Sequence, residues 1–477
     1  MGTDYYLSSQ VAAGNDSQDR AAGDVSPPRA APAAKLKVRL RSPAVTMAVW
    51  IVVAITSGML VAWLHLREFP MLSALDELQH LDALDAATQG RVVRVGDRVG
   101  QLAMSTQACR GIDATFTIPS CHPGRPYDPS SFQEDGFNTS DVHPPTYYFL
   151  TSVPARMLVT VGVADDLFEG GRIAGGIWLG LGVVAFWRLT RRLGIDRRGR
   201  WTALVLVATT PVVVHASATI NPDATAFLTS CLVGIAVLAW EDGRLSLWIV
   251  LIAAVFAVSL KATNALGVGA WGLYLLWRAA ERRAGPGTTE RAAPWQLAGG
   301  AAVVGAGAAT VLGWTLARRA IARTGANFQI ERFAIEDLTA GDVLAQVLGL
   351  VTPVLPNYLP AVLSGPWSVA LTSLLHVALI ATCLGPVFSM TRLERAQKIA
   401  VAGAVTMLAG GVTLTLANVL LVSQAVAIPF RYGLSLLPLL GVGLAVATRS
   451  RIPRVVLGTL AGASALVTAA ALLGLPI

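Results

Sequence analysis

The sequence predicts an all-α, polytopic integral membrane protein with about 11 transmembrane helices. The chain has 477 residues, of which 54% are hydrophobic and only 14% are charged, and its mean hydropathy is +0.57. A soluble domain typically has about 25% charged residues. Apolar runs long enough to cross a bilayer recur along the chain, separated by short basic segments. These observations exclude an ordinary soluble enzyme, a disordered regulator and a secreted disulfide scaffold.

The basic residues indicate how the chain is oriented. It has 37 Lys and Arg against 29 Asp and Glu, a net charge of +8. Cytoplasmic loops of membrane proteins carry the excess of Lys and Arg. About half of the arginines stand at edges of apolar runs that we assign to the inner face: Arg188, Arg191, Arg192, Arg197, Arg198, Arg200, Arg244, Arg278, Arg282, Arg283, Arg291, Arg392, Arg395, Arg449, Arg451 and Arg454, with Lys398. The charge therefore indicates orientation, and we expect no nucleic-acid partner.

The chain begins with a polar segment followed by a first span. Residues 1–44 are rich in Ala, Gly, Ser, Asp, Arg and Pro and lack apolar periodicity, which predicts a disordered cytoplasmic tail. The run 45–66 has about the 20 residues that a span needs, and no small-residue cleavage site follows it. A long outer loop at 67–143 comes next. A disulfide between its Cys109 and Cys121 would need an oxidising compartment, and the spacing alone leaves that pairing open.

The apolar stretch 145–164 is interrupted by Pro154 and Arg156. The arginine-rich loop 188–200 is inside only if one complete span, near 171–189, separates it from the outer loop. We therefore expect 145–164 to be an interfacial or re-entrant helix on the outer face.

The remaining spans follow the same rule and place the C-terminus outside. Residues 318–366 form a second outer segment, whose prolines Pro353, Pro356 and Pro360 predict a re-entrant part. Residues 45–477 are thus interpreted as one transmembrane domain. The other spans are expected near 201–220, 223–240, 245–261, 262–277, 296–317, 367–389, 399–420, 432–448 and 454–475.

The outer loop opens with the sequence Leu75-Asp76-Glu77-Leu78-Gln79-His80. A helix here would put Asp76 and His80 on one face, at i and i+4. Carboxylates beside a membrane surface suit a general base for a lipid-linked substrate, because partial desolvation raises their basicity. The alternative is an interfacial helix with its acidic end in water.

Two further motifs are expected at the outer face. His143-Pro144-Pro145 precedes the paired Tyr147 and Tyr148, which suit either a binding groove or a membrane-interface anchor. Asn221-Pro222-Asp223 lies between two spans, where helix capping alone would account for Asp223.

Two cations stand where the orientation rule does not place them. Lys261 lies on the outer side of apolar sequence, and Arg431 precedes a span at its outer end. A phosphate ligand would explain both. A snorkelling lysine and an arginine paired with an outer carboxylate such as Asp223 are the structural alternatives.

Several sequence motifs are absent. The chain has no Walker loop, no HExxH or zinc-type Cys/His spacing, and no GxSxG elbow. We expect no nucleotide cofactor; a divalent cation and any metal ligands stay open.

The order of these motifs resembles the GT-C superfamily, polytopic glycosyltransferases that use polyprenyl-phosphate sugars. The likeness covers residues 45–450, and it is greatest to a bacterial branch of unassigned specificity. It implies a GT-C-like fold with interfacial helices in the first outer loop.

The resemblance also implies roles for individual residues. Asp76 would be the general base, Glu77 a second carboxylate or metal ligand, and Lys261 and Arg431 the donor-phosphate ligands. Orientation or acceptor binding would fall to His80, His143, Tyr147, Tyr148 and Asp223.

We therefore expect transfer of a sugar from a polyprenyl-phosphate donor to a cell-envelope glycan, lipid or protein, at the outer face of a bacterial plasma membrane. The alternatives are a flippase or other transporter of lipid-linked sugars and a non-catalytic membrane scaffold for envelope synthesis.

Overall fold

The computed structural model describes residues 43–113, 117–284, 292–323, 334–335, 339–351, 363, 365–388, 393–422, 425–426 and 428–475. Almost all regular structure in this part of the chain is helical, which confirms the predicted all-α class. Two sheets of two short strands complete it. β1 (Leu72–Ser73) pairs in parallel with β2 (Ile112–Asp113), and β3 (Ala334–Ile335) pairs antiparallel with β4 (Ala425–Val426). The predicted tail 1–44 lies almost wholly outside the described residues, as do the prolines of the second outer segment.

The chain is a multi-pass membrane protein by the length and apolarity of its helices. Within the described ranges, eight helices are long and apolar enough to span a membrane, or nine if the bent pair α6 and α7 forms one span. Each of the 11 predicted spans coincides with a helix or a helix pair, but α9 has only 14 residues and α10 is charged at its end. The number 11 is therefore not confirmed.

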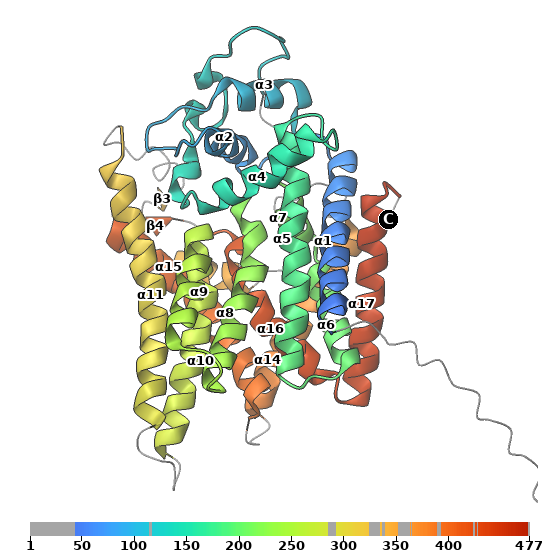
Figure 1. Cartoon of the computed structure of the whole chain (residues 1–477), viewed down its shortest axis with the longest axis vertical. Coiled ribbons are helices and arrows are strands. Elements are labelled where there is room, and N and C mark those ends of the chain that lie inside the picture. Colours follow the sequence, from blue (N-terminus) through green and yellow to red (C-terminus); the bar gives the residue numbers. More distant parts are fainter. Residues whose placement is uncertain are drawn as a thin grey trace, which may run out of the picture.

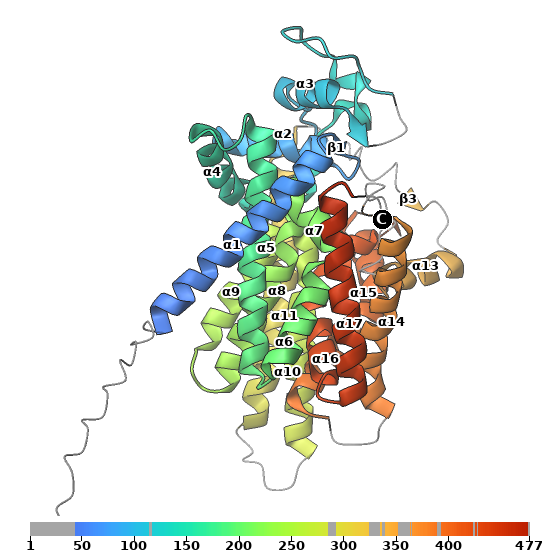
Figure 2. The same ribbon diagram turned by 90° about the vertical axis from the view of Figure 1, so that its right-hand side faces the viewer.

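The long helices form a bundle in which α1 crosses at a tilt and meets α5 (Figure 2). Gly58 of α1 lies against Gly176 and Gly180 of α5, where an added Cβ would clash with backbone. The bundle helices are α1 (Pro43–Glu68), α5 (Leu167–Arg192), α6 (Arg197–Ala208), α7 (Pro211–Ala218), α8 (Ala226–Glu241), α9 (Leu247–Leu260), α10 (Ala265–Ala284), α11 (Ala292–Ala320), α14 (Pro366–Phe388), α15 (Arg395–Val422), α16 (Leu437–Ala447) and α17 (Arg451–Leu472).

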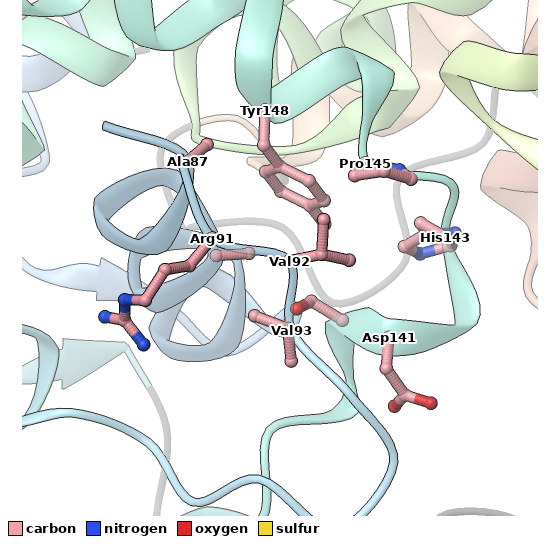
Figure 3. A pocket seen from close by; sticks show the side chains of 10 residues that line it. Ala87, Arg91, Val92, Val93, Asp141, His143, Pro145 and Tyr148 are labelled. Carbon is pink, nitrogen blue, oxygen red and sulfur yellow. The ribbon is translucent and has the colours of Figure 1, made fainter. Parts of the chain in front are cut away.

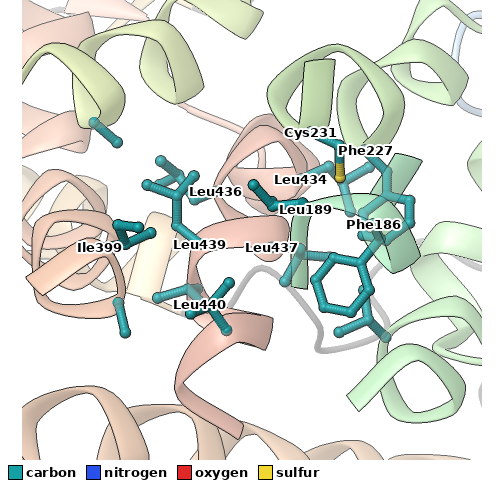
Figure 4. Close-up of a cluster of buried hydrophobic side chains, with 14 of the residues drawn as sticks. Phe186, Leu189, Phe227, Cys231, Ile399, Leu434, Leu436, Leu437, Leu439 and Leu440 are labelled. Atoms are coloured by element: carbon teal, nitrogen blue, oxygen red, sulfur yellow. The ribbon is translucent and has the colours of Figure 1, made fainter. Parts of the chain in front are cut away.

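The apolar core lies between these helices. Leucines 436, 437, 439 and 440 at the start of α16 pack between Ile399 of α15 and the aromatic pair Phe186 and Phe227 (Figure 4). These side chains are almost completely buried, so they fix α16 against α5 and α8. α13 (Ala340–Val351) packs on α15 at one side.

One end of the bundle is covered by a layer of shorter helices (Figure 1). It comprises α2 (Glu77–Thr88), α3 (Gln101–Arg110), α4 (Thr146–Thr160) and three 3-10 turns, η1 (Pro129–Ser131), η2 (Gln133–Gly136) and η3 (Thr139–Val142). We call it the α2–α4 layer. A disulfide joins Cys109 to Cys121 within it, which settles the pairing that the spacing left open.

Helix α4 accounts for most of the stretch 145–164. It lies in the α2–α4 layer beside α2 and α5, and it is not among the candidate spans. Leu150, Val153 and Met157 form an exposed apolar stripe at helical spacing along it. This arrangement is that expected of an interfacial helix, although its place relative to a bilayer stays a prediction.

The opposite end of the bundle holds the arginine-rich edges. Arg192 at the end of α5 and Arg395 at the start of α15 both contact Asp242 after α8, at 3.0 and 3.1 Å. Arg395 also contacts Glu241, and Lys398 contacts Glu281 of α10. Segments far apart in the sequence thus bring their basic residues to one face, as predicted. The end of α17 lies at the other face, where Gly474 approaches Glu68 of α1.

Candidate active site

Asp76 introduces helix α2 in an unusual backbone conformation. As the N-cap residue it has φ 61° and ψ 18°, the left-handed region that non-glycine residues seldom adopt. Its side chain is 40% exposed, whereas that of neighbouring Glu77 is 1% exposed. The strained turn therefore leaves the Asp76 carboxylate partly exposed, while the Glu77 carboxylate is buried. Strain of this kind costs about 1–3 kcal/mol and clusters at functional sites.

Arg431 lies between two carboxylates from distant parts of the chain. It belongs to η6 (Phe430–Leu436), which precedes α16. Its Nη2 donates to Asp76 Oδ2 at 2.8 Å, and its Nε is 3.3 Å from Asp223 Oδ2. One guanidinium thus contacts two acids through two of its nitrogens, and its planar fork fixes the directions of both contacts.

Lys261 completes this group through the other oxygen of Asp223. It follows α9, and its Nζ forms an ion pair with Asp223 Oδ1; both side chains are 1% exposed. The Lys261 ammonium also lies 4.9 Å from the centre of the Tyr432 ring. Asp223 sits in η4 (Pro222–Thr225), directly before α8. We call Asp76, Asp223, Lys261, Arg431 and Tyr432 the Arg431 cluster.

The Arg431 cluster lies at the bundle end that meets the α2–α4 layer. α8 runs from the neighbourhood of Asp223 to Glu241 at the arginine-rich end, so the two charged groups are one helix length apart. Asp76, Lys261 and Arg431, which belong to separate motifs of the sequence, thus lie together in the structure. Asp223 joins them as the partner of both cations, which goes beyond the capping role that the sequence alone explained.

The two predicted motif residues His80 and Tyr148 contact each other directly. Tyr148 Oη and His80 Nδ1 are 2.7 Å apart, and the His143 ring lies 5.6 Å from that of His80. Burial lowers the pKa of His80 to about 3 and lowers that of His143 well below its ordinary value. Both imidazoles are therefore neutral at pH 7, which suits them to orient groups by hydrogen bonding.

We expect the free energy of unfolding to fall as the pH drops below about 6.5. Below this pH the unfolded chain binds protons at His80 and His143, whereas the folded chain does not, because the pKa of His80 is lowered to about 3 and that of His143 is also well below its ordinary value. The slope is at most about 1.4 kcal/mol per pH unit for each histidine. Thermal unfolding in detergent from pH 7.5 to 4.5 measures it. His80→Gln should flatten the slope, and an unchanged slope would contradict the assignment.

Tyr147 connects the layer to the Asn221-Pro-Asp223 turn. The backbone N–H of Asn221 donates to Tyr147 Oη at 3.1 Å, and the Asn221 side chain accepts from the N–H of Asp223. Tyr147 is completely buried. It therefore supports the turn that presents Asp223, and an acceptor-binding role for it stays a prediction.

Glu77 is engaged in a different way from Asp76. Its two oxygens accept four hydrogen bonds: from Arg172 Nε at 2.8 Å and Nη2 at 2.6 Å, from Ser73 N at 2.7 Å and from Ile220 N at 3.0 Å. All the accepting positions of the carboxylate are thus occupied. The expected role of Glu77 as a second catalytic carboxylate or metal ligand stays a prediction, and its contacts favour a positioning role.

Arg172 is the site residue that the sequence reasoning missed. It is 1% exposed and lies six residues into α5, close to the end that faces the α2–α4 layer. The rule that singled out Lys261 and Arg431, a cation on the outer side of apolar sequence, applies equally to Arg172.

A small pocket lies beside Tyr148, between α2 with the segment that follows it and the stretch from η3 to the start of α4 (Figure 3). Tyr148, His143, Asp141, Arg91 and several apolar residues line it, and it has room for about one water molecule. No three His, Cys, Asp or Glu side chains gather as a metal site among the residues that the structure describes.

Residues 142–314 match the family model described as dolichyl-phosphate-mannose-protein mannosyltransferase. The resemblance to GT-C glycosyltransferases is thereby confirmed over this segment. It contains Tyr147, Tyr148, Arg172, Asp223 and Lys261, whereas Asp76 and Arg431 lie outside it.

Among solved structures, the chain is similar to ArnT from Cupriavidus metallidurans, crystallised with undecaprenyl phosphate. The two share 15% identity with a TM-score of 0.48, over 86% of this chain and 62% of that one. The chain therefore spans less than two thirds of the length of that structure. The search of curated protein sequences found no match to this chain.

Proposed function

We propose that this chain transfers a sugar from a polyprenyl-phosphate donor to a cell-envelope acceptor at the outer face of the bacterial plasma membrane. The observation that carries the proposal is the contact of Arg431 with both Asp76 and Asp223 at the bundle end covered by the α2–α4 layer. The match of residues 142–314 to a family of lipid-phosphate-dependent mannosyltransferases supports it.

In the proposed reaction, Asp76 accepts the proton of the acceptor hydroxyl as its oxygen attacks the anomeric carbon. The bond from that carbon to the phosphate oxygen breaks, and polyprenyl phosphate leaves with the electron pair. Negative charge thus moves from the Asp76 carboxylate to the leaving phosphate. Arg431 would stabilise this charge if its Nη2, which now contacts Asp76, turned to the leaving phosphate.

The Asp76–Arg431 contact therefore describes a resting arrangement. Donor phosphate competes for Arg431 and leaves Asp76 free to accept a proton. Asp223 stays with Arg431 through the Nε edge, and Lys261 neutralises Asp223. In this proposal Lys261 acts on the donor through Asp223 and Arg431, in place of the direct phosphate contact expected from the sequence.

The proposed orientation puts the N-terminus in the cytoplasm and the α2–α4 layer and C-terminus outside. The gathering of basic residues at the other end supports it. The disulfide of Cys109 with Cys121 lies in the α2–α4 layer, and a disulfide is stable in an oxidising compartment outside the cytoplasm.

The test is a single assay on membranes containing the chain and a radiolabelled polyprenyl-phosphate sugar. Transfer predicts that free polyprenyl phosphate and labelled acceptor appear together. A flippase would move intact donor between leaflets without releasing polyprenyl phosphate, and a scaffold would do neither. Intact donor after prolonged incubation with cell-envelope extract would overturn the proposal.

A further inference from the structure

The buried ion pair of Arg172 with Glu77 lies beside the Arg431 cluster and takes no part in the reaction proposed above. Besides Glu77, Arg172 binds two backbone carbonyls: Nη1 donates to Phe69 O at 2.5 Å and Nη2 to Met71 O at 2.7 Å. The guanidinium also lies 4.3 Å from the centre of the Phe168 ring. It thus fixes the segment that leaves α1 and enters the Asp76 turn.

Glu77 extends this contact to two further segments. One of its oxygens accepts from Ser73 N in β1, and the other accepts from Ile220 N, three residues before Asp223. Asp76 is the neighbour of Glu77 in the chain. The Arg172–Glu77 ion pair therefore binds the backbone of the two turns whose carboxylates contact Arg431: the turn that contains Asp76 and the turn that contains Asp223.

We propose that the Arg172–Glu77 ion pair is a positioning device that sets the separation of the Asp76 and Asp223 carboxylates, and through them the place of Arg431. This inference rests on the proposed function. Arg172 and Glu77 are positioning residues in it, because their hydrogen bonds are to each other and to backbone.

The energetics of buried ion pairs favour this interpretation. A buried pair pays a large desolvation cost, and well-packed apolar residues often stabilise a fold equally well. Arg172 and Glu77 use their remaining hydrogen-bonding groups on four backbone groups, which apolar side chains would leave without partners. The pair also holds Asp76 in its left-handed conformation, because Ser73 and Glu77 on either side of it are both tied down.

The decisive variant is Glu77→Gln. The amide has nearly the shape of the carboxylate, but its NH2 group faces either Ser73 N–H or Ile220 N–H, so one turn loses its acceptor. We expect kcat for sugar transfer to fall by about 100-fold, as displacement of about 1 Å in an active site does. The KM for the donor should change less than kcat, because the charge of Arg431 is retained.

Two controls separate positioning from general stability. Leu444→Ala removes a buried side chain of α16 near the arginine-rich end and should lower the unfolding temperature without lowering kcat. Arg172→Lys keeps the charge, but its three N–H donors cannot replace all four hydrogen bonds that Arg172 makes to Glu77, Phe69 O and Met71 O. It should give an intermediate loss of kcat, and it serves in place of Glu77→Gln if that variant does not fold.

Hydrogen exchange read by mass spectrometry tests the device without relying on activity. In Glu77→Gln, amides of residues 69–81 or 215–224 should exchange faster, while those of α14 and α17 should not. Unchanged exchange in both segments would overturn the positioning role even if no sugar transfer is ever found. Full kcat in an active protein would overturn it as well, whereas an inactive wild type with the expected exchange pattern would count against the proposed function alone.

Discussion

Asp76→Asn is expected to reduce sugar transfer by about 100- to 10,000-fold, the usual contribution of a general base. Asparagine tolerates the left-handed conformation that Asp76 adopts, so the turn before α2 should be retained. Its amide oxygen can still accept from Arg431, but the side chain no longer accepts the acceptor's proton. The rate of label transfer from a polyprenyl-phosphate donor in membranes measures the effect, with the protein level checked in each sample.

Asp85→Asn is the matched control for this variant. Asp85 lies on the same helix α2, and its side chain contacts Gln89 at the surface, away from the Arg431 cluster. Its transfer rate should equal that of the wild type. Full transfer by Asp76→Asn at a normal protein level would remove Asp76 from the mechanism and leave the cluster as a structural contact.

The sequence predicts the parts of this site that depend on hydropathy and charge. The positive-inside pattern placed the arginine edges on one face, and their ion pairs with Asp242 and Glu241 lie there. The same pattern marked Lys261 and Arg431 as exceptions, and both meet Asp223. These features are readable because each depends only on which end of a span a residue occupies.

The roles of neighbouring carboxylates were beyond that reasoning. Asp76 and Glu77 are adjacent acids with the same chemistry. The left-handed backbone at Asp76 leaves the Asp76 side chain partly exposed and directs that of Glu77 into the buried ion pair with Arg172. The acceptor of the Ile220 N–H is set by a tertiary contact with Glu77, across 143 residues of sequence. Hydropathy also cannot distinguish α9 from a complete span, because α9 is as apolar as a span but has only 14 residues.

Arg431→Ala is expected to lower kcat for sugar transfer by about 100- to 1000-fold, the usual cost of removing one group that stabilises developing negative charge. The truncation also leaves Asp76 without its partner, while Asp223 keeps Lys261. Arg431→Lys should recover part of the rate, because it restores the charge but lacks the planar guanidinium fork that fixes the directions of the contacts. Single-turnover transfer with saturating donor measures both variants.

Arg449→Ala provides the control at the other end of the bundle. Arg449 is exposed and pairs with Glu394, so its removal takes away one positive charge without touching the cluster. It should transfer sugar at the wild-type rate, since surface pairs contribute at most about 1 kcal/mol. If Arg431→Ala and Arg449→Ala transfer sugar at the same rate, Arg431 does not stabilise the negative charge that develops on the leaving phosphate. If only Arg431→Ala is slow and Arg431→Lys is intermediate, the exchange of Arg431 between Asp76 and phosphate accounts for both the rate and its dependence on the guanidinium.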